Sequence, residues 1–117
     1  MRKILTPAFV FAALMSTSAV SLAQYNGPSS IPLATAKQIT DSGTDDQKAI
    51  LRGKIISHDG DNNYTFQDNT GKISVEISKR HFPANQPIGP EQQVELHGEL
   101  DKDRHGVEFD VDQLRVL

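Results

Sequence analysis

Carboxylate side chains recur at every second position along the last part of the chain. They alternate with Val, Leu and Phe in the runs 94–100 and 107–112. Successive side chains of a β-strand point to opposite faces, so these carboxylates are predicted to share the outer face of a sheet, where like charges repel. The residues concerned are Glu95, Glu99, Glu108, Asp110 and Asp112, with Glu76 on an earlier run and Arg52, Lys54, Lys72 and Arg115 as the available counter-charges. The array is interpreted either as a docking surface for a cationic ligand or as a solvated face that keeps edge strands soluble.

Histidine and carboxylate residues occur together at two places where they could contact a metal ion. His58 and Asp61 lie in one short polar turn, which imitates the start of an EF-hand loop but lacks its central Gly and its final Glu. His97 lies between two glutamates, and imidazole with carboxylate suits zinc or copper. The alternatives are ordinary turn chemistry for the first group and an exposed histidine for the second. The sequence predicts no cofactor.

No set of residues predicts catalysis. Ser, His and Asp are present, but in no spacing that suggests a nucleophile elbow. The absence of Cys excludes a thiol nucleophile, a thiolate zinc site and a disulfide scaffold. The paired carboxylates of the predicted strands face outward, and nothing in the sequence would raise their pKa. We therefore predict that the protein is not an enzyme.

Five short runs with a period of two predict a small all-β barrel. They span residues 49–56, 64–68, 72–77, 94–100 and 107–116, with polar turns between most of them. We expect a closed or nearly closed antiparallel barrel with one core that includes Tyr64, Phe66 and Phe109. Gly53 and Gly98 occupy inward positions, where glycine lets a strand bend. The segment 78–90 contains three prolines and cannot hold a long helix.

Residues 1–23 are predicted to be a cleavable signal peptide that directs the protein to the periplasm. Arg2 and Lys3 precede an apolar run over residues 4–15, and Ser21-Leu22-Ala23 fits the rule for cleavage after Ala23. The run is too short to span a bilayer, which needs about 20 apolar residues. We expect a flexible leader over residues 24–33 and one domain over residues 34–117, beginning with a short helix for which Thr35 is a possible N-cap. Without the signal the chain carries 10 basic and 15 acidic residues, so nucleic-acid binding is not expected.

The chain resembles the bacterial OB-fold (BOF) family of exported stress-tolerance proteins, the YgiW/YdeI family. The resemblance covers residues 31–117 and implies a five-stranded Greek-key OB barrel in the periplasm, linked to envelope stress tolerance and without known catalytic residues. The segment 80–90, with its prolines, departs from the family pattern. The matching motifs are Leu51-Arg52-Gly53-Lys54-Ile55, Tyr64-Thr65-Phe66-Gln67-Asp68, Gly71-Lys72-Ile73, Val75-Glu76-Ile77, Val94-Glu95-Leu96-His97-Gly98-Glu99-Leu100-Asp101-Lys102-Asp103 and Val107-Glu108-Phe109-Asp110-Val111.

Polar side chains of the second and third runs complete the predicted binding face. Many OB folds bind ligands there, and Thr65, Gln67, Lys72 and Ser74 are the outward residues. We predict a non-enzymatic periplasmic binding module whose ligand is a cationic peptide, a metal ion or a peptidoglycan fragment. The alternative is a protein-interaction subunit that regulates an envelope enzyme or a porin. Neither reading includes a membrane span.

Overall fold

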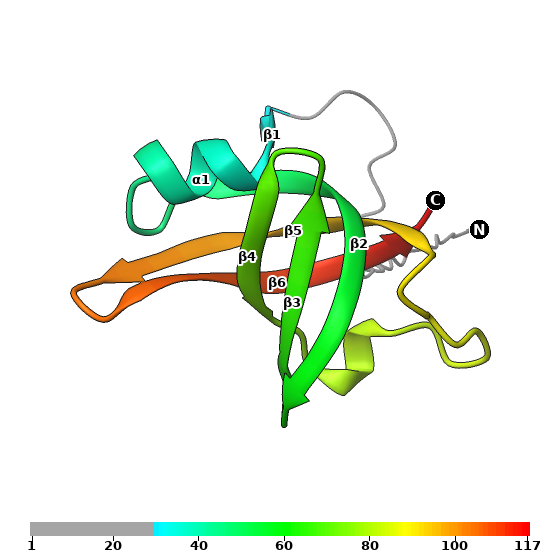
Figure 1. Ribbon diagram of the computed structural model, residues 1–117. Coiled ribbons are helices and arrows are strands. Elements are labelled where there is room, and N and C mark those ends of the chain that lie inside the picture. Colours follow the sequence, from blue (N-terminus) through cyan, green and yellow to red (C-terminus); the bar gives the residue numbers. More distant parts are fainter. Residues whose placement is uncertain (1–29) are drawn as a thin grey trace, which may run out of the picture.

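The computed structural model describes residues 30–117, which form a small β-barrel with one helix against it (Figure 1). The predicted signal peptide and residues 24–29 of the predicted leader lie outside the described residues. The elements in chain order are β1 (Leu33–Ala34), α1 (Ala36–Ser42), β2 (Lys48–Gly60), β3 (Asn63–Asp68), β4 (Gly71–Glu76), the 3-10 helix η1 (Lys79–His81), β5 (Gln93–Asp103) and β6 (Gly106–Val116). β1 takes in Leu33, the last residue of the predicted leader.

One sheet closes on itself to make the barrel. The strand order is β1-β2-β3-β4-β6-β5, and β2 also pairs with β5, which completes the ring. The predicted antiparallel arrangement is wrong at one seam, because β4 pairs with β6 in parallel, with Val75 opposite Phe109. The chain between these two strands crosses to the far side of the barrel to form β5, which the local alternation of residues does not reveal. The barrel is therefore mixed, and β1 adds a second parallel pair with β2.

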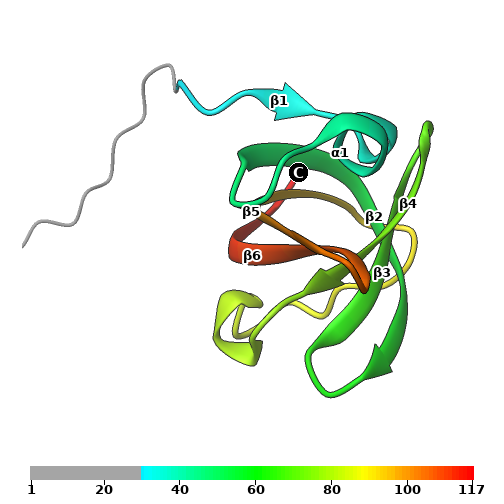
Figure 2. The same cartoon turned by 90° about the vertical axis from the view of Figure 1, so that its left-hand side faces the viewer.

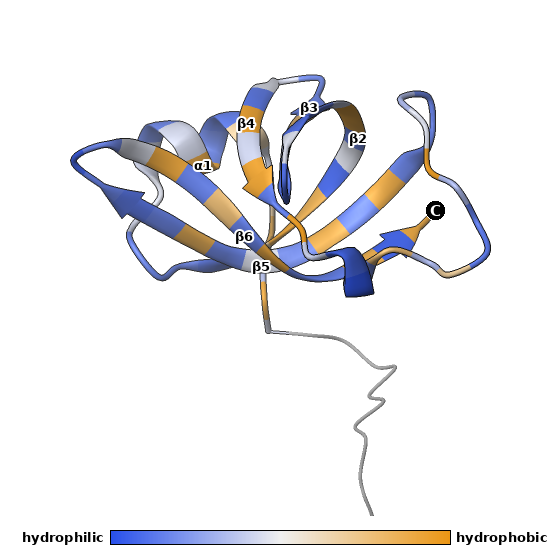
Figure 3. Ribbon diagram, turned by 90° about the horizontal axis from the view of Figure 1, so that it is seen from below, coloured by the Kyte–Doolittle hydropathy of each residue, from blue (hydrophilic) through white to orange (hydrophobic). Residues whose placement is uncertain are grey.

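The predicted alternation of inward and outward residues builds the core (Figure 3). Phe66 and Phe109 are fully buried there, as predicted, whereas Tyr64 is only partly buried at its margin. Each phenylalanine ring packs on an inward glycine. A Cβ atom on Gly53 would lie 2.7 Å from Cζ of Phe66, and one on Gly98 would lie 2.8 Å from Cε2 of Phe109. Both glycines are therefore needed for close packing across the barrel.

A β-bulge in β6 sets which side chains of the β5–β6 hairpin face each other. His97 pairs with Gln113 but Gly98 pairs with Val111, so Asp112 is the extra residue. Beyond the bulge the inward positions change from odd to even numbers. Arg115 consequently points outward beside β5, whereas an unbroken alternation would turn it toward the core.

Helix α1 begins at a capping box and packs across one end of the barrel (Figure 2). The Thr35 hydroxyl accepts from the amide of Gln38, and the Gln38 side chain accepts from the amide of Thr35. Ala36 and Ile39 are buried against the barrel. Asp68, at the end of β3, accepts from the amide of Ala36 at 2.8 Å. The predicted helix is thus confirmed, and Asp68 joins its first turn to the barrel.

The segment between β4 and β5 contains no long helix, as its three prolines predict. Its only helical part within the described residues is η1, a single 3-10 turn, and Phe82 follows it and stacks obliquely on Tyr64 with 5.4 Å between ring centroids. Over residues 30–117 there is no helix long and apolar enough to cross a membrane.

Candidate functional site

Strand register gathers most of the predicted carboxylates on one side of the barrel. Asp110 of β6 lies opposite Glu76 of β4 on one side and Glu99 of β5 on the other. Glu108, two residues earlier, lies opposite Ser74 and Asp101 in the same way. We call this surface the acidic face, defined by Glu76, Glu99, Asp101, Glu108 and Asp110. It extends along the β5–β6 hairpin toward a tip that is strongly hydrophilic in Figure 3.

Within residues 30–117, no ion pair neutralises the acidic face. None of its five carboxylates takes part in an ion pair with another residue of the described part of the chain. Partial burial raises the pKa of Glu108, and the charges of Asp110 and Asp101 raise it further. The pKa of Asp110 is raised by burial and then by Glu76, Asp101 and Asp112. The structure therefore corrects the expectation that nothing would raise the pKa of these carboxyl groups.

A shallow groove runs along the acidic face beside the hairpin tip. It has a volume of about 260 Å³. Ser74, Asp101 and Glu108 contribute to it from three adjacent strands, and Asp103 and His105 extend it to the turn. The predicted site residues Ser74 and Glu108 are thus brought together. Asp112 is exposed at the bulge, outside the groove.

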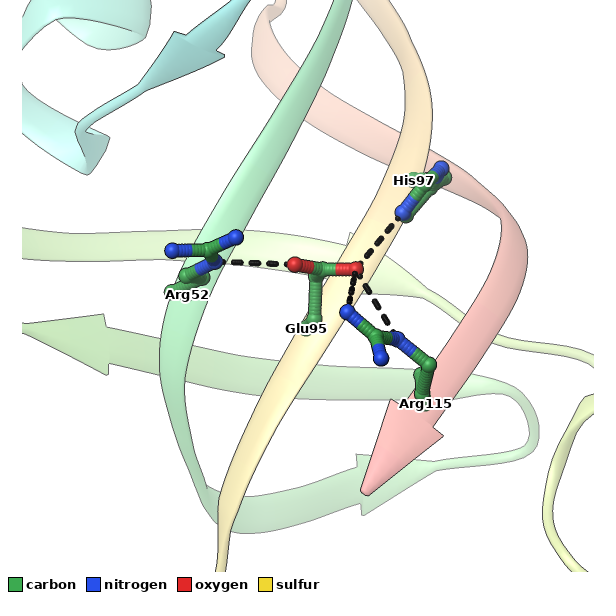
Figure 4. A network of polar contacts seen from close by, with 4 residues as sticks. All are labelled: Arg52, Glu95, His97 and Arg115. Carbon is green, nitrogen blue, oxygen red and sulfur yellow. Dashed lines mark hydrogen bonds and ion pairs between the residues drawn. The ribbon is translucent and has the colours of Figure 1, made fainter. Parts of the chain in front are cut away.

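Glu95 has a different environment from the other predicted carboxylates (Figure 4). Its side chain is only 4% exposed, although it projects from the outer face of β5. Nε of Arg52 donates to one carboxylate oxygen at 2.8 Å. Arg115 donates to the other oxygen through Nε at 3.2 Å and through a terminal nitrogen at 2.9 Å, and Nε2 of His97 lies 2.9 Å from the same oxygen. We call these four residues the Glu95 cluster.

The Glu95 cluster holds its carboxylate ionised. Burial would raise the pKa of Glu95, but hydrogen bonds from His97, Arg52 and Arg115 outweigh burial and lower the pKa to about 2. The expectation that the Glu95 side chain faces solvent is therefore wrong. The two arginines, from strands on either side of β5, fold over the carboxylate and cover it. The expectation that Arg52 and Arg115 compensate acidic residues is confirmed for this carboxylate.

The predicted polar residues of β3 and β4 form cross-strand pairs on one outer face. Thr65 pairs with Ser74, and Gln67 pairs with Lys72. The Thr65 hydroxyl donates to Asp59 at 2.7 Å, which ties β3 to the end of β2. Through Ser74 this face continues into the acidic face. Through Gln67 it continues into a second groove, lined also by Arg52 and Lys54 of β2.

The two predicted metal contacts are engaged in other interactions. Nε2 of His58 lies 2.7 Å from the backbone oxygen of Asp61, and its ring stacks on Tyr64 with 4.4 Å between centroids. His97 belongs to the Glu95 cluster. Across residues 30–117 no three His, Asp or Glu side chains are arranged to hold a metal ion.

A closed five-stranded barrel with polar outer faces and aromatic residues in its core defines a protein of the OB-fold class. A family model described as "Bacterial OB fold (BOF) protein" matches residues 15–116, and the chain belongs to this family. The calcium-regulated OB-fold protein CarO of Pseudomonas aeruginosa is 35% identical over 109 residues, which cover 92% of this chain and 93% of CarO. Protein YgiW of Escherichia coli K12 is 38% identical over 73 residues, 62% of this chain and 55% of YgiW.

Solved structures support the same fold. The structure of E. coli YgiW superposes with a TM-score of 0.69 at 32% identity, covering 78% of this chain and all of that one (100%). Replication protein A of Ustilago maydis, solved with single-stranded DNA, superposes with a TM-score of 0.55 at 18% identity, covering 74% of this chain and 72% of that one. The second likeness concerns the fold alone.

Proposed function

We propose that this protein is a non-enzymatic periplasmic binding module that captures cationic peptide segments on its acidic face and so contributes to envelope stress tolerance. The observation that carries the proposal is the strand register that places Asp110 opposite Glu76 and Glu99, with no ion pair to any of these carboxylates within residues 30–117. Folded proteins avoid placing like charges opposite each other in a sheet. A bound cation would relieve this repulsion, so the surface is electrostatically complementary to a positively charged ligand.

A peptide fits the acidic face better than a single metal ion does. The carboxylates are spread along two strand registers and a groove, and they do not converge as metal ligands. Several Lys or Arg side chains of one peptide could each meet a different carboxylate. A peptidoglycan fragment would depend more on the uncharged groups of Thr65, Gln67 and Ser74. The relative described as calcium-regulated makes Ca²⁺ the metal to test beside the peptide.

The experiment compares two double variants of equal net charge. A fluorescent oligolysine peptide is titrated into the mature protein, into Glu108→Gln/Asp110→Asn, and into Glu91→Gln/Asp41→Asn, whose changes lie off the acidic face. We expect the first double variant to lose about tenfold in affinity and the second to bind as the wild type does. Ca²⁺ and a muropeptide are titrated in parallel. Equal losses in both double variants, or binding unchanged in the first, would refute the proposal.

Export to the periplasm is part of the proposal. It is supported by the charged, apolar and small-residue segments of residues 1–23. Expression of the full chain in a Gram-negative host, followed by osmotic-shock fractionation and N-terminal sequencing, tests it. We expect a periplasmic product that begins at Gln24. A cytoplasmic product that retains Met1 would contradict export.

The alternative, a protein-interaction subunit, is favoured by the outer edge of β1. Among the strands of the described residues, this strand pairs with β2 alone, and Leu33 is 56% exposed. A partner strand could add to this edge through backbone hydrogen bonds. Salt separates the two functions, because peptide capture by carboxylates weakens at high ionic strength whereas strand addition does not.

A further inference from the structure

We propose a second binding site, separate from the acidic face, that takes a small oxyanion, the carboxylate or phosphate group of a soluble ligand. The site is the groove over β2 and β3, which has a volume of about 520 Å³. We call it the basic groove and define it by Arg52, Lys54, Gln67, Asn69 and Gln93, which line it. It uses none of the residues of the acidic face, so the two proposals stand or fall separately.

Strand register explains how these side chains come together. Lys54 of β2 lies opposite Gln67 of β3 on one side and Gln93 of β5 on the other. Arg52 lies two residues before Lys54 and therefore on the same face. The result is two cations bordered by amide side chains, a donor set that suits carboxylate or phosphate oxygens and the hydroxyl groups that accompany them.

The buried carboxylate of Glu95 orients Arg52 for this role. Only Nε of Arg52 donates to Glu95, and no other residue in the described part of the chain accepts from its two terminal nitrogens. The side chain remains 51% exposed while its guanidinium plane is anchored. Because a fixed guanidinium loses less entropy on binding, an anchored Arg52 binds an oxyanion better than a mobile surface arginine would. Glu95 is thus a positioning residue.

Two carboxylates border the basic groove, and each has other partners within the described residues. Asp68 also lines the groove, but its oxygens accept from the amides of Ala36, Thr70 and Gly71 and from the Thr70 hydroxyl. Burial would raise the pKa of Asp68, and the hydrogen bonds from these groups outweigh it and lower the pKa. Glu91 lies 3.9 Å from the amino group of Lys54 with its side chain 92% exposed, so an anion can displace it.

The chemistry of the groove favours a small ligand over a nucleic-acid strand. Single-stranded nucleic acid binds OB folds by stacking bases on exposed aromatic rings in a basic channel. Among residues 30–117 no aromatic side chain lines the basic groove, and Phe66, on the same strand as Gln67, is fully buried. One oxyanion with attached hydroxyl groups therefore matches the donors of the groove.

The test uses the two arginines of the Glu95 cluster as a matched pair. Both donate to Glu95, but only Arg52 lines the basic groove. Amide chemical shifts of the mature protein are followed while inorganic phosphate, glucuronic acid or a short oligodeoxythymidine is added. We expect phosphate or glucuronic acid to shift residues 52–54, 67–69 and 93. Arg52→Gln should weaken that binding by about tenfold or more, while Arg115→Gln should retain it.

The results distinguish a phosphate ligand from a carboxylate ligand, and three of the possible results would refute the proposal. Binding of phosphate alone or of glucuronic acid alone, lost in Arg52→Gln, supports the site and identifies its ligand class. A third variant, Lys54→Gln, should reduce the affinity less. The proposal is overturned if neither small anion shifts the groove residues at millimolar concentration, if Arg115→Gln is as damaging as Arg52→Gln, or if the oligodeoxythymidine binds there more tightly than both.

Discussion

The β5–β6 hairpin carries two carboxylate regions with opposite electrostatics, one on each side of the bulge. On the side of the bulge away from the hairpin turn, Glu95 meets Arg52 and Arg115, and its pKa is lowered to about 2. On the side toward the turn, Asp110 meets Glu76 and Glu99, and its pKa is raised. Both regions stand on the outer face of the same two strands. Whether a carboxylate stabilises the fold is therefore decided by the charges opposite it on the neighbouring strands. Its place in the alternation of inward and outward residues does not decide this, because Glu95 and Asp110 both point outward.

This contrast gives the two regions different functions. The Glu95 cluster satisfies its own charge, so its carboxylate acts within the fold and leaves only guanidinium groups for a ligand. The carboxylates of the acidic face have no cationic partner within the described residues, so their mutual repulsion lowers the stability of the folded protein. A bound cationic ligand would restore that stability. A small barrel can thus carry a basic and an acidic surface, each set by the partners that strand register gives to its charged side chains.

The strongest test of the contrast removes one carboxylate from each region. Glu95→Ala should lower the unfolding free energy by about 3 kcal/mol at pH 7, because it removes the carboxylate whose pKa folding lowers to about 2. Glu99→Ala, on the same strand but opposite Asp110, should be neutral or slightly stabilising. Urea unfolding at pH 7 measures both. If the two variants were equally stable, Glu95 would be no more than another surface carboxylate.

Acid unfolding should show the two regions acting in opposite directions. The pKa of Glu95 falls from 4.5 to about 2 on folding, so the unfolded chain binds the proton more readily and acid removes about 3 kcal/mol of stability between about pH 5 and pH 2. Folding raises the pKa of Glu108 and of Asp110. Protonation of these two carboxylates in acid therefore relieves repulsion and adds stability as the pH falls.

Two variants isolate these pH contributions. Glu95→Gln should flatten the loss of stability below pH 5, whereas Glu108→Gln/Asp110→Asn should make the net loss steeper. Urea midpoints measured from pH 7 to pH 2 supply the comparison. Parallel profiles for the wild type and Glu95→Gln would show that the cluster does not control the acid limb.

The sequence predicted the barrel well because its period of two reports directly on which side chains face the core. Phe66, Phe109 and the inward glycines follow from that period alone. The parallel β4–β6 seam does not, since it depends on contacts between distant strands. The bulge leaves one visible signal, because the apolar series 107, 109, 111 continues at 114 and 116 with a step of three residues.

From the sequence alone Glu95 and Asp110 received the same interpretation, because the three-residue step from 111 to 114 was not taken as the sign of a bulge. Alternation places both outward, but cross-strand partners depend on register, and register depends on the bulge. The arginines were available as counter-charges in the sequence, yet nothing local assigns both to one glutamate. The basic groove was missed for the same reason, since Gln93 reaches it only through the pairing of β2 with β5.

Neutralising the acidic face should stabilise the folded protein by a smaller amount. Glu108→Gln/Asp110→Asn removes the repulsion with Glu76 and Asp101, and we expect a gain of about 0.5–1 kcal/mol in unfolding free energy at pH 7. Added salt should stabilise the wild type more than this variant, because screening relieves the same repulsion. Thermal melts at low and high ionic strength measure the difference. A variant less stable than the wild type would mean that these carboxylates make favourable contacts.

The smallest expected effect on stability comes from replacing the histidine of each region, His97 in the Glu95 cluster and His105 in the groove of the acidic face. His97 is 26% exposed in its side chain and contacts Glu95, whereas His105 lines the acidic groove and its side chain makes no hydrogen bond within the described residues. His97→Ala should cost about 0.5–1 kcal/mol at pH 7, less than is usual for a hydrogen bond to a charged group, because Glu95 keeps its two arginine donors. His105→Ala should change stability by less.

A double-mutant cycle that combines His97→Ala with Glu95→Gln isolates the coupling between His97 and Glu95, because the loss of stability in His97→Ala should largely vanish once the carboxylate is gone. A coupling near zero would leave the two arginines as the only functional partners of Glu95, and the cluster would then be a simple arginine clamp.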